Sequence, residues 1–150
     1  VRRMEPLRPA VEHAQAQPPE PPRLRVLLAD DHPLVREGLA GLLRMEADID
    51  LVGEALDGEM AVRMARELQP EVVVLDVSMP QINGIAATHH IAAEMPQVRI
   101  IVLSCYTQEE MAMTLREPGA AAYLTKDAPI DELLNATRGG EPPPKPRMPK

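Results

Sequence analysis

The chain has 150 residues, of which 45% are hydrophobic, and a formal net charge of −7, which suffices for one domain with a buried core but not for two of ordinary size. Phe and Trp are absent and only one Cys occurs, so the core must be aliphatic and an intrachain disulfide is excluded. No apolar run is long enough to span a membrane, and we expect a soluble, cytoplasmic protein with no membrane partner.

Proline and charge divide the chain into three segments. Eleven of the 17 prolines lie outside residues 24–138, which predicts a disordered, Pro-rich extension over 1–23 and a Pro-rich tail or start of a linker over 139–150. The middle segment carries nine Lys or Arg against 19 Asp or Glu. A segment this acidic should repel nucleic acid on its own.

Apolar patterns alternate along the middle segment. A short apolar run at 24–29 predicts a buried strand, and residues 33–45, which begin with a proline, have apolar positions at helical spacing. The alternation continues with strands at 50–55, 72–75, 100–103 and 121–124 and helices at 58–68, 84–95, 107–116 and 130–138. Five such units predict an α/β, flavodoxin-like doubly wound fold, with a five-stranded parallel sheet flanked by five helices.

Acidic residues close two of the predicted strands. Asp30 and Asp31 follow the first strand, and Asp76 follows the third. In the strand order 2-1-3-4-5 these strands are neighbours, and the carboxyl ends of parallel strands form the ligand crevice. Ser104 ends the fourth strand and Lys126 follows the fifth, so a hydroxyl and an ammonium should line the same crevice.

This combination of side chains favours phosphoryl chemistry with a metal. Crowded carboxylates repel one another, and a hard, oxygen-binding cation such as Mg²⁺ relieves that repulsion. Asp76 is ionised at neutral pH and can attack an activated phosphoryl group without a general base. The expected product is an aspartyl phosphate, with Lys126 compensating the negative charge.

At these residues the chain resembles a known family. The matching segments are ADDHPLVREG at 29–38, VLDVSMP at 74–80 with NG at 83–84, LS at 103–104, and GAAAYLTKDA at 119–128. Together they span most of the middle segment in the correct order. It resembles the CheY-like receiver domain of two-component response regulators, and within that family the NarL/FixJ type, whose receiver precedes a LuxR-type DNA-binding helix-turn-helix.

The resemblance implies a role for each site residue. Asp76 would be the phosphoacceptor, and Ser104 and Lys126 would contact the phosphoryl oxygens. Tyr123 would be the aromatic residue that rotates on switching. The implied Mg²⁺ ligands are Asp30, Asp31, Asp76 and the backbone carbonyl of Ser78.

The resemblance also implies partners. A sensor histidine kinase would supply the phosphoryl group, and the surface of the fourth helix, fifth strand and fifth helix would then change. The resemblance implies that transcription would be regulated through an output domain. No helix-turn-helix follows residue 140, so DNA binding is not encoded in these 150 residues. A homodimer is compatible with this family. The chemistry would be self-catalysed phosphoryl acceptance and autodephosphorylation, so we do not expect an enzyme.

Two positions depart from the family pattern. Asp127 stands after Lys126 where many receivers have a cis proline, which leaves the loop geometry open. Pro118 stands where the NarL/FixJ pattern usually has Ala, and it predicts that the fourth helix ends by about residue 116.

Two other functions use the same residues. A haloacid-dehalogenase-type phosphatase also forms an aspartyl phosphate, but its second aspartate would fall at position 78, which is Ser. A receiver-fold interaction module without phosphorylation is the other alternative. Taken singly, each site residue also has a structural explanation: a strand-end Asp caps a helix, and Tyr123 packs in the sheet.

Overall fold

The computed structural model describes residues 22–77, 84–104 and 119–140. Its centre is one five-stranded sheet in the order β2-β1-β3-β4-β5, with every neighbouring pair parallel. This confirms the predicted fold class and strand order. Both bounds of each predicted strand lie within about one residue of the observed bounds. The strands are β1 Leu24–Ala29, β2 Ile49–Ala55, β3 Val72–Asp76, β4 Arg99–Ser104 and β5 Ala122–Thr125.

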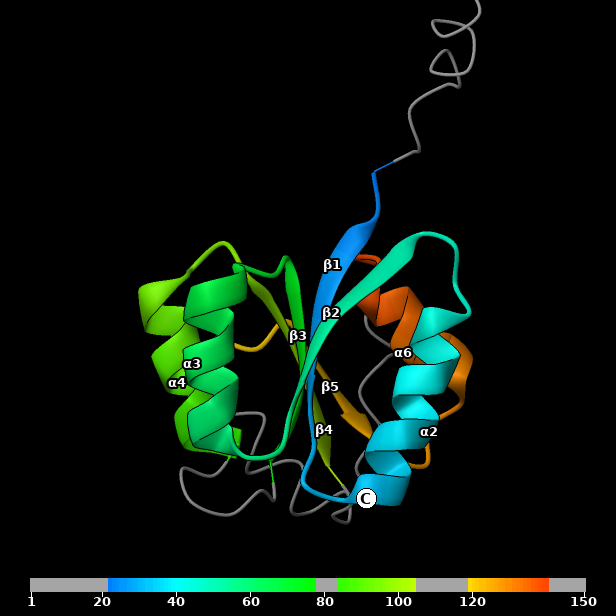
Figure 1. Ribbon diagram of the computed structural model, residues 1–150, viewed down its shortest axis with the longest axis horizontal. Helices are drawn as coiled ribbons and strands as arrows, with labels where there is room; N and C mark the ends of the chain where they lie inside the picture. The colour runs from blue at the N-terminus through cyan, green and yellow to red at the C-terminus, as the bar shows by residue number, and fades with distance from the viewer. Residues whose placement is uncertain (1–21, 78–83, 105–118, 141–150) are drawn as a thin grey trace, which may run out of the picture.

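Helices cover both faces of the sheet (Figure 1). α3 (Gly58–Leu68) and α4 (Gly84–Glu94) lie on one face, and α2 (Pro33–Arg44) and α6 (Ile130–Thr137) lie on the other. The helix predicted at 107–116 and Pro118 lie outside the described residues. So do nearly all of the two predicted tails, and the domain boundaries stay a prediction.

Strand residues alternate between two apolar layers. Leu27, Val73 and Ile100 point into the core beneath α3 and α4, whereas Leu28, Val74 and Ile101 point into the core beneath α2 and α6. Both sets are fully buried. Successive side chains of a strand point to opposite faces, so a continuous apolar run fills both layers. The polar residues that follow these runs are left at the carboxyl edge of the sheet.

The apolar residues of α2 are buried to different extents. Ala40 and Leu43 are buried against the sheet, but Leu34 is 83% exposed and Leu42 is 43% exposed. Pro33 occupies the first turn and fixes where the helix begins. The helix therefore contacts the sheet along a narrow stripe that includes Ala40 and Leu43.

Two arginines attach the carboxyl-terminal end of α6 near the amino-terminal ends of the strands. Arg99, the first residue of β4, donates from Nε to the carbonyl of Ala136 (2.8 Å) and from a terminal nitrogen to the carbonyl of Gly140 (3.4 Å). Arg138 donates to Asp48 and Glu46 in the loop before β2. Gly140 therefore lies at the amino-terminal edge of the strands, opposite the predicted pocket.

Candidate functional site

Two neighbouring strands bring Asp30 and Asp76 together. Ala29 of β1 pairs with Leu75 of β3, so the residues that follow them emerge side by side at the carboxyl edge of the sheet. Both Asp30 and Asp76 are fully buried. Burying a carboxylate is costly unless a charge or hydrogen bonds compensate it, so this edge of the sheet must carry compensating groups.

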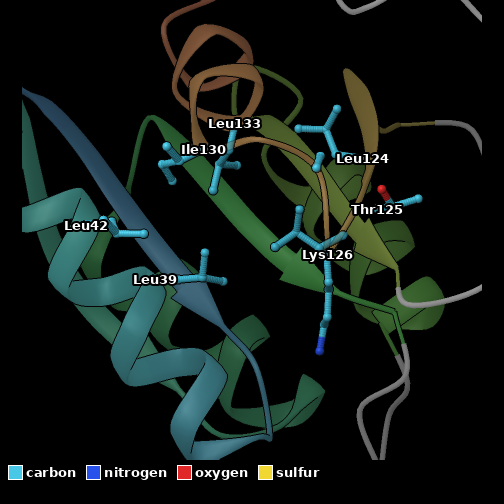
Figure 2. Close-up of a pocket in the computed structure, with 9 residues that line it drawn as sticks. Leu39, Leu42, Leu124, Thr125, Lys126, Ile130 and Leu133 are labelled. Carbon is cyan, nitrogen blue, oxygen red and sulfur yellow. The ribbon is translucent and has the colours of Figure 1, made fainter.

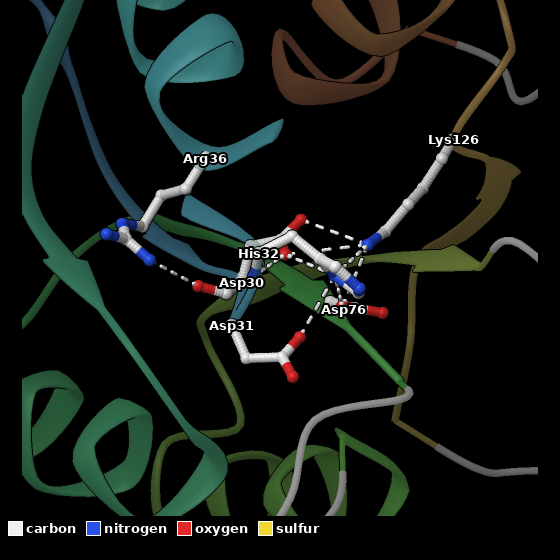
Figure 3. Close-up of polar contacts among 6 residues, drawn as sticks. All are labelled: Asp30, Asp31, His32, Arg36, Asp76 and Lys126. Carbon is white, nitrogen blue, oxygen red and sulfur yellow. Dashed lines mark hydrogen bonds and ion pairs between the residues drawn. The ribbon is translucent and has the colours of Figure 1, made fainter. Parts of the chain in front are cut away.

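Lys126 supplies a positive charge between the two carboxylates (Figure 3). Its Nζ lies 2.9 Å from Oδ2 of Asp76 and 3.2 Å from Oδ2 of Asp30. Burial alone would lower the pKa of Lys126, but its hydrogen bond to Asp76 and the charges of Asp76 and Asp30 outweigh that effect, and the pKa is raised. Lys126 is therefore charged at neutral pH.

A short turn positions Lys126. The backbone N–H of Lys126 donates to the carbonyl of Ser104 at the end of β4 (2.8 Å), and the N–H of Ala128 donates to the carbonyl of Thr125 (3.0 Å). The loop geometry that the sequence left open at Asp127 is thus a tight turn directly after β5. The turn directs Lys126 across the end of the sheet toward β1 and β3.

Asp31 and His32 complete the cluster. Nδ1 of His32 lies 3.2 Å from Oδ1 of Asp31, 3.4 Å from Oδ1 of Asp30 and 3.3 Å from Nζ of Lys126. The backbone N–H of His32 also donates to Oδ1 of Asp30 (2.8 Å). His32 directly precedes α2, and its ring faces the carboxylates.

Arg36 contacts the site from the other side of β1, and sequence analysis did not single it out. Its guanidinium donates to the backbone carbonyl of Asp30 (3.0 Å) and lies 3.5 Å from Oε1 of Glu54. Glu54 belongs to the edge strand β2. The available signal was the position of Arg36, one helical turn after His32.

The remaining predicted site residues lie as follows. Ser104 is fully buried at the end of β4, next to the turn that carries Lys126. Tyr123 is half-buried on β5 and packs against the apolar layer beneath α3 and α4. Ser78 lies outside the described residues, so its predicted role as a metal ligand stays a prediction.

The donor atoms of this cluster fit a divalent cation. Ligand atoms of Asp30, Asp31, His32 and Asp76 all lie within 4.8 Å of one another. Oδ2 of Asp30 and Oδ1 of Asp31 are enclosed and accept no hydrogen bond from the described residues, although Lys126 and His32 lie near them. Enclosed carboxylate oxygens with unused acceptor capacity are what a hard cation requires.

An apolar hollow adjoins the polar cluster (Figure 2). It has a volume of about 250 Å³ between α2, β5 and α6, and Leu39, Leu124 and Leu133 are among the residues that line it. The aliphatic stem of Lys126 also lines it, while the nitrogen points away from the other labelled side chains. Lys126 thus separates an apolar compartment from the charged one.

The sequence also matches a known family. The family profile of the response regulator receiver domain covers residues 26–138. The chain belongs to the response regulator receiver family. Every described residue of the acidic cluster lies inside this match, and the pocket of Asp30, Asp31, Asp76 and Lys126 is consistent with the phosphorylation site of a receiver domain.

Individual response regulators give the same result. The chain is 42% identical to the transcriptional regulatory protein LiaR of Bacillus subtilis over 122 residues, which cover 79% of this chain and 58% of LiaR. It is also 42% identical to the response regulator GacA of Pseudomonas protegens over 118 residues, 77% of this chain and 54% of GacA. The chain therefore spans little more than half the length of these relatives.

Solved receiver structures share the fold. The receiver domain of the putative response regulator NarL from Mycobacterium tuberculosis superposes with a TM-score of 0.72 at 29% identity, covering 79% of this chain and 99% of that one. A LuxR-family response regulator from Aurantimonas gives 0.71 at 32% identity, covering 80% and 89%. These relatives confirm the resemblance to the NarL/FixJ type. None of the helices in the described ranges has the length and apolar character needed to cross a bilayer.

Proposed function

We propose that this receiver domain accepts a phosphoryl group on Asp76 from the phosphohistidine of a sensor histidine kinase. The observation that carries the proposal is Lys126, whose ammonium lies within 3.2 Å of two fully buried carboxylates. Phosphoryl transfer depends mainly on positioning and charge neutralisation. The pocket holds a nucleophile and a cation that can compensate the charge the phosphoryl group brings.

In the proposed step, a carboxylate oxygen of Asp76 attacks the phosphorus atom. A P–O bond forms and the P–N bond of the phosphohistidine breaks, and its electron pair returns to the imidazole nitrogen of the kinase. Lys126 then pairs with a phosphoryl oxygen, and the hydroxyl of Ser104 donates a hydrogen bond to another. No general base is required, because the carboxylate is already deprotonated at neutral pH.

Asp30, Asp31 and Asp76, with the carbonyl of Ser78, would hold Mg²⁺. Oδ2 of Asp30 and Oδ1 of Asp31 are enclosed and accept no hydrogen bond from the described residues, which supports this assignment. When bound, the ion neutralises charge on the phosphoryl oxygens. The chain itself contributes the carboxylates that bind the ion and the fixed sheet edge that keeps them in place.

The consequence of phosphorylation would be a change of surface rather than catalytic turnover. The chain would act as a cytoplasmic switch that dephosphorylates itself, with Tyr123 and the surface around β5 and α6 changing, and not as an enzyme. LiaR and GacA are named as regulators and are longer than the aligned segment. We therefore propose that the switch regulates transcription through an output domain outside this sequence. DNA would be bound only by that domain, and a homodimer stays a prediction.

The direct test measures the mass of the intact chain after incubation with Mg²⁺ and a small acyl phosphate donor. We expect a base-labile phosphoryl adduct in the wild type and none in Asp76→Asn. Asp50→Asn is the matched control, because Asp50 lies on β2 with a side chain that is 42% exposed. That variant should form the adduct like the wild type.

Other outcomes identify the alternatives. Continued release of phosphate over many turnovers would indicate a phosphatase. An unmodified wild type under conditions that label a known receiver would indicate an interaction module without phosphorylation. An adduct retained in Asp76→Asn would refute Asp76 as the acceptor.

A further inference from the structure

The backbone of Asp30 is held from two sides. Its N–H donates to the carbonyl of Ala55 on β2 (3.1 Å), and its carbonyl accepts from Arg36 on α2 (3.0 Å). The carbonyl of Asp30 lies in the same rigid plane as the N–H of Asp31, because the peptide bond does not rotate freely. A group that fixes this carbonyl therefore fixes the direction in which the chain continues from one carboxylate to the next.

Glu54 in turn orients Arg36. The side chain of Arg36 is only 15% exposed, and its Nε lies 3.5 Å from Oε1 of Glu54. Glu54 is paired in the sheet with Leu28 of β1, two residues before Asp30. The guanidinium thus lies between the edge strand and the turn that carries both acids. Its planar shape allows it to bind a carboxylate and a carbonyl at the same time.

The contact lies away from the reacting atoms. In Figure 3, Arg36 approaches the main chain of Asp30 on the side opposite to Lys126. Arg36 would therefore touch neither the phosphoryl group nor the ion. Its effect would pass through the geometry of the turn from Asp30 to Asp31.

We propose that Arg36 is a positioning residue for the acidic pocket, and that it fixes the peptide plane between Asp30 and Asp31 so that both carboxylates face the cation. This inference rests on the proposed function, because it assigns Arg36 a part in the Mg²⁺ binding that phosphoryl acceptance requires. Groups that orient metal ligands without touching the metal typically change metal affinity by about 10-fold to 100-fold when they are removed.

The chain contains a matched control for this role. Arg44 is also on α2 and also binds Glu54, at 2.9 Å, but it is 57% exposed, and among the described residues its side chain binds Glu54 and not Asp30. Arg36→Met and Arg44→Met each remove one cation from the same helix and one partner from Glu54. Only Arg36→Met removes the bond to the Asp30 carbonyl.

The experiment is a calorimetric titration with Mg²⁺ of the wild type, Arg36→Met, Arg36→Lys and Arg44→Met. We expect Arg36→Met to weaken Mg²⁺ binding by about tenfold and Arg44→Met to leave it unchanged. Arg36→Lys keeps a hydrogen-bond donor but lacks the planar guanidinium with its several donors, and it should recover part of the Mg²⁺ affinity. Adduct formation in Arg36→Met should be slow at low Mg²⁺ and approach the wild-type rate when Mg²⁺ saturates.

A merely structural role predicts a different pattern. In that case Arg36→Met would lower the melting temperature without metal while keeping the Mg²⁺ affinity of the wild type, and the proposal would be wrong. Equal losses of affinity in Arg36→Met and Arg44→Met would also refute it, because they would trace the effect to Glu54 or to net charge. If Arg36→Met does not fold, Arg36→Lys decides, since an affinity and Mg²⁺ dependence equal to those of the wild type would refute the role.

The same measurements separate this inference from the proposed function. A wild type that binds no Mg²⁺ and forms no adduct would refute both. A wild type that binds Mg²⁺ and is phosphorylated on Asp76, beside an Arg36→Met variant with equal affinity, would refute the role of Arg36 alone.

Discussion

Nζ of Lys126 lies 2.9 Å from Oδ2 of Asp76, although 50 positions separate the two residues along the chain. β4 lies between β3, which contains Asp76, and β5, which Lys126 follows. The side chain of Lys126 must therefore extend past the end of β4. The sheet order makes this contact possible, and the turn after β5 directs the side chain toward it.

Removing the charge of Lys126 should destabilise the chain without metal. Lys126→Met keeps an apolar stem but leaves two buried carboxylates without their cation. We expect the free energy of unfolding to fall by about 2 kcal/mol, somewhat less than for a fully enclosed pair because 13% of the side chain is exposed. Urea unfolding followed by circular dichroism measures this change, with the exposed Arg63→Met as control. An unchanged stability would contradict the proposed charge compensation.

Removing a carboxylate should have the opposite effect. Asp31→Ala relieves repulsion among three acids and removes an enclosed oxygen that accepts no hydrogen bond from the described residues. We expect the stability without metal to rise by about 1 kcal/mol, as often happens when a functional site is disabled, while Mg²⁺ binding weakens. Thermal unfolding with and without Mg²⁺ tests both effects. A fall in stability without metal would count against the crowded-carboxylate interpretation.

Gly84 should not tolerate a side chain. A Cβ at this position would overlap the carbonyl of Asp76 and the Cα of Val77, which are backbone atoms that cannot move aside cheaply. We expect Gly84→Ala to cost about 2 kcal/mol, although alanine is the better helix former. Gly38 on α2 has no atom within 4 Å of the corresponding position, so Gly38→Ala should stabilise by up to about 1 kcal/mol. Chemical denaturation of both variants measures the two changes in the free energy of unfolding. Equal changes in Gly84→Ala and Gly38→Ala would contradict the prediction.

Acid should weaken the attachment of α6 to the loop before β2. The hydrogen bond from Arg138 lowers the pKa of Asp48 below its ordinary value of 3.8. The folded state thus favours the ionised carboxylate, and this contribution is present above pH 3.8 and lost as the pH falls through the lowered folded value.

The matching experiment is a pH series of melting temperatures for the wild type and Asp48→Asn. The difference between them should be constant near neutral pH and vanish at pH values below the folded pKa. Arg138→Met removes the donor, so Asp48→Asn should have little further effect in that background. A difference that persists in strong acid would show that the hydrogen bond is not its source.

The part of the site that follows from topology could be predicted from the sequence. Asp30 and Asp76 each come directly after an apolar run and Lys126 directly follows β5, and the strand order alone brings these positions to one end of the sheet. Side-chain geometry could not be predicted in this way. The contact of Arg36 with the Asp30 carbonyl depends on a rotamer and on Glu54, which lies on a different element with no local pattern linking it to Arg36.

The degree of burial along α2 could not be predicted from the sequence for a related reason. Leu34 and Leu42 fit an amphipathic pattern, but a helical pattern specifies only the spacing of apolar residues. The width of the stripe that is buried depends on how the helix lies on the sheet, which is a property of the whole fold. Leu34 is consequently left 83% exposed.

The attachment of Gly140 to Arg99 has a mechanical consequence. Arg99 begins β4 and Ser104 ends it, so the carboxylates and the point where the chain continues are separated by the full length of a strand, about 20 Å. Gly140 therefore lies near the ends of the strands opposite to the proposed phosphorylation site. A change at Asp76 would therefore reach Gly140 only through a displacement of whole helices or strands, and the stiffness of the sheet would determine the size of that displacement.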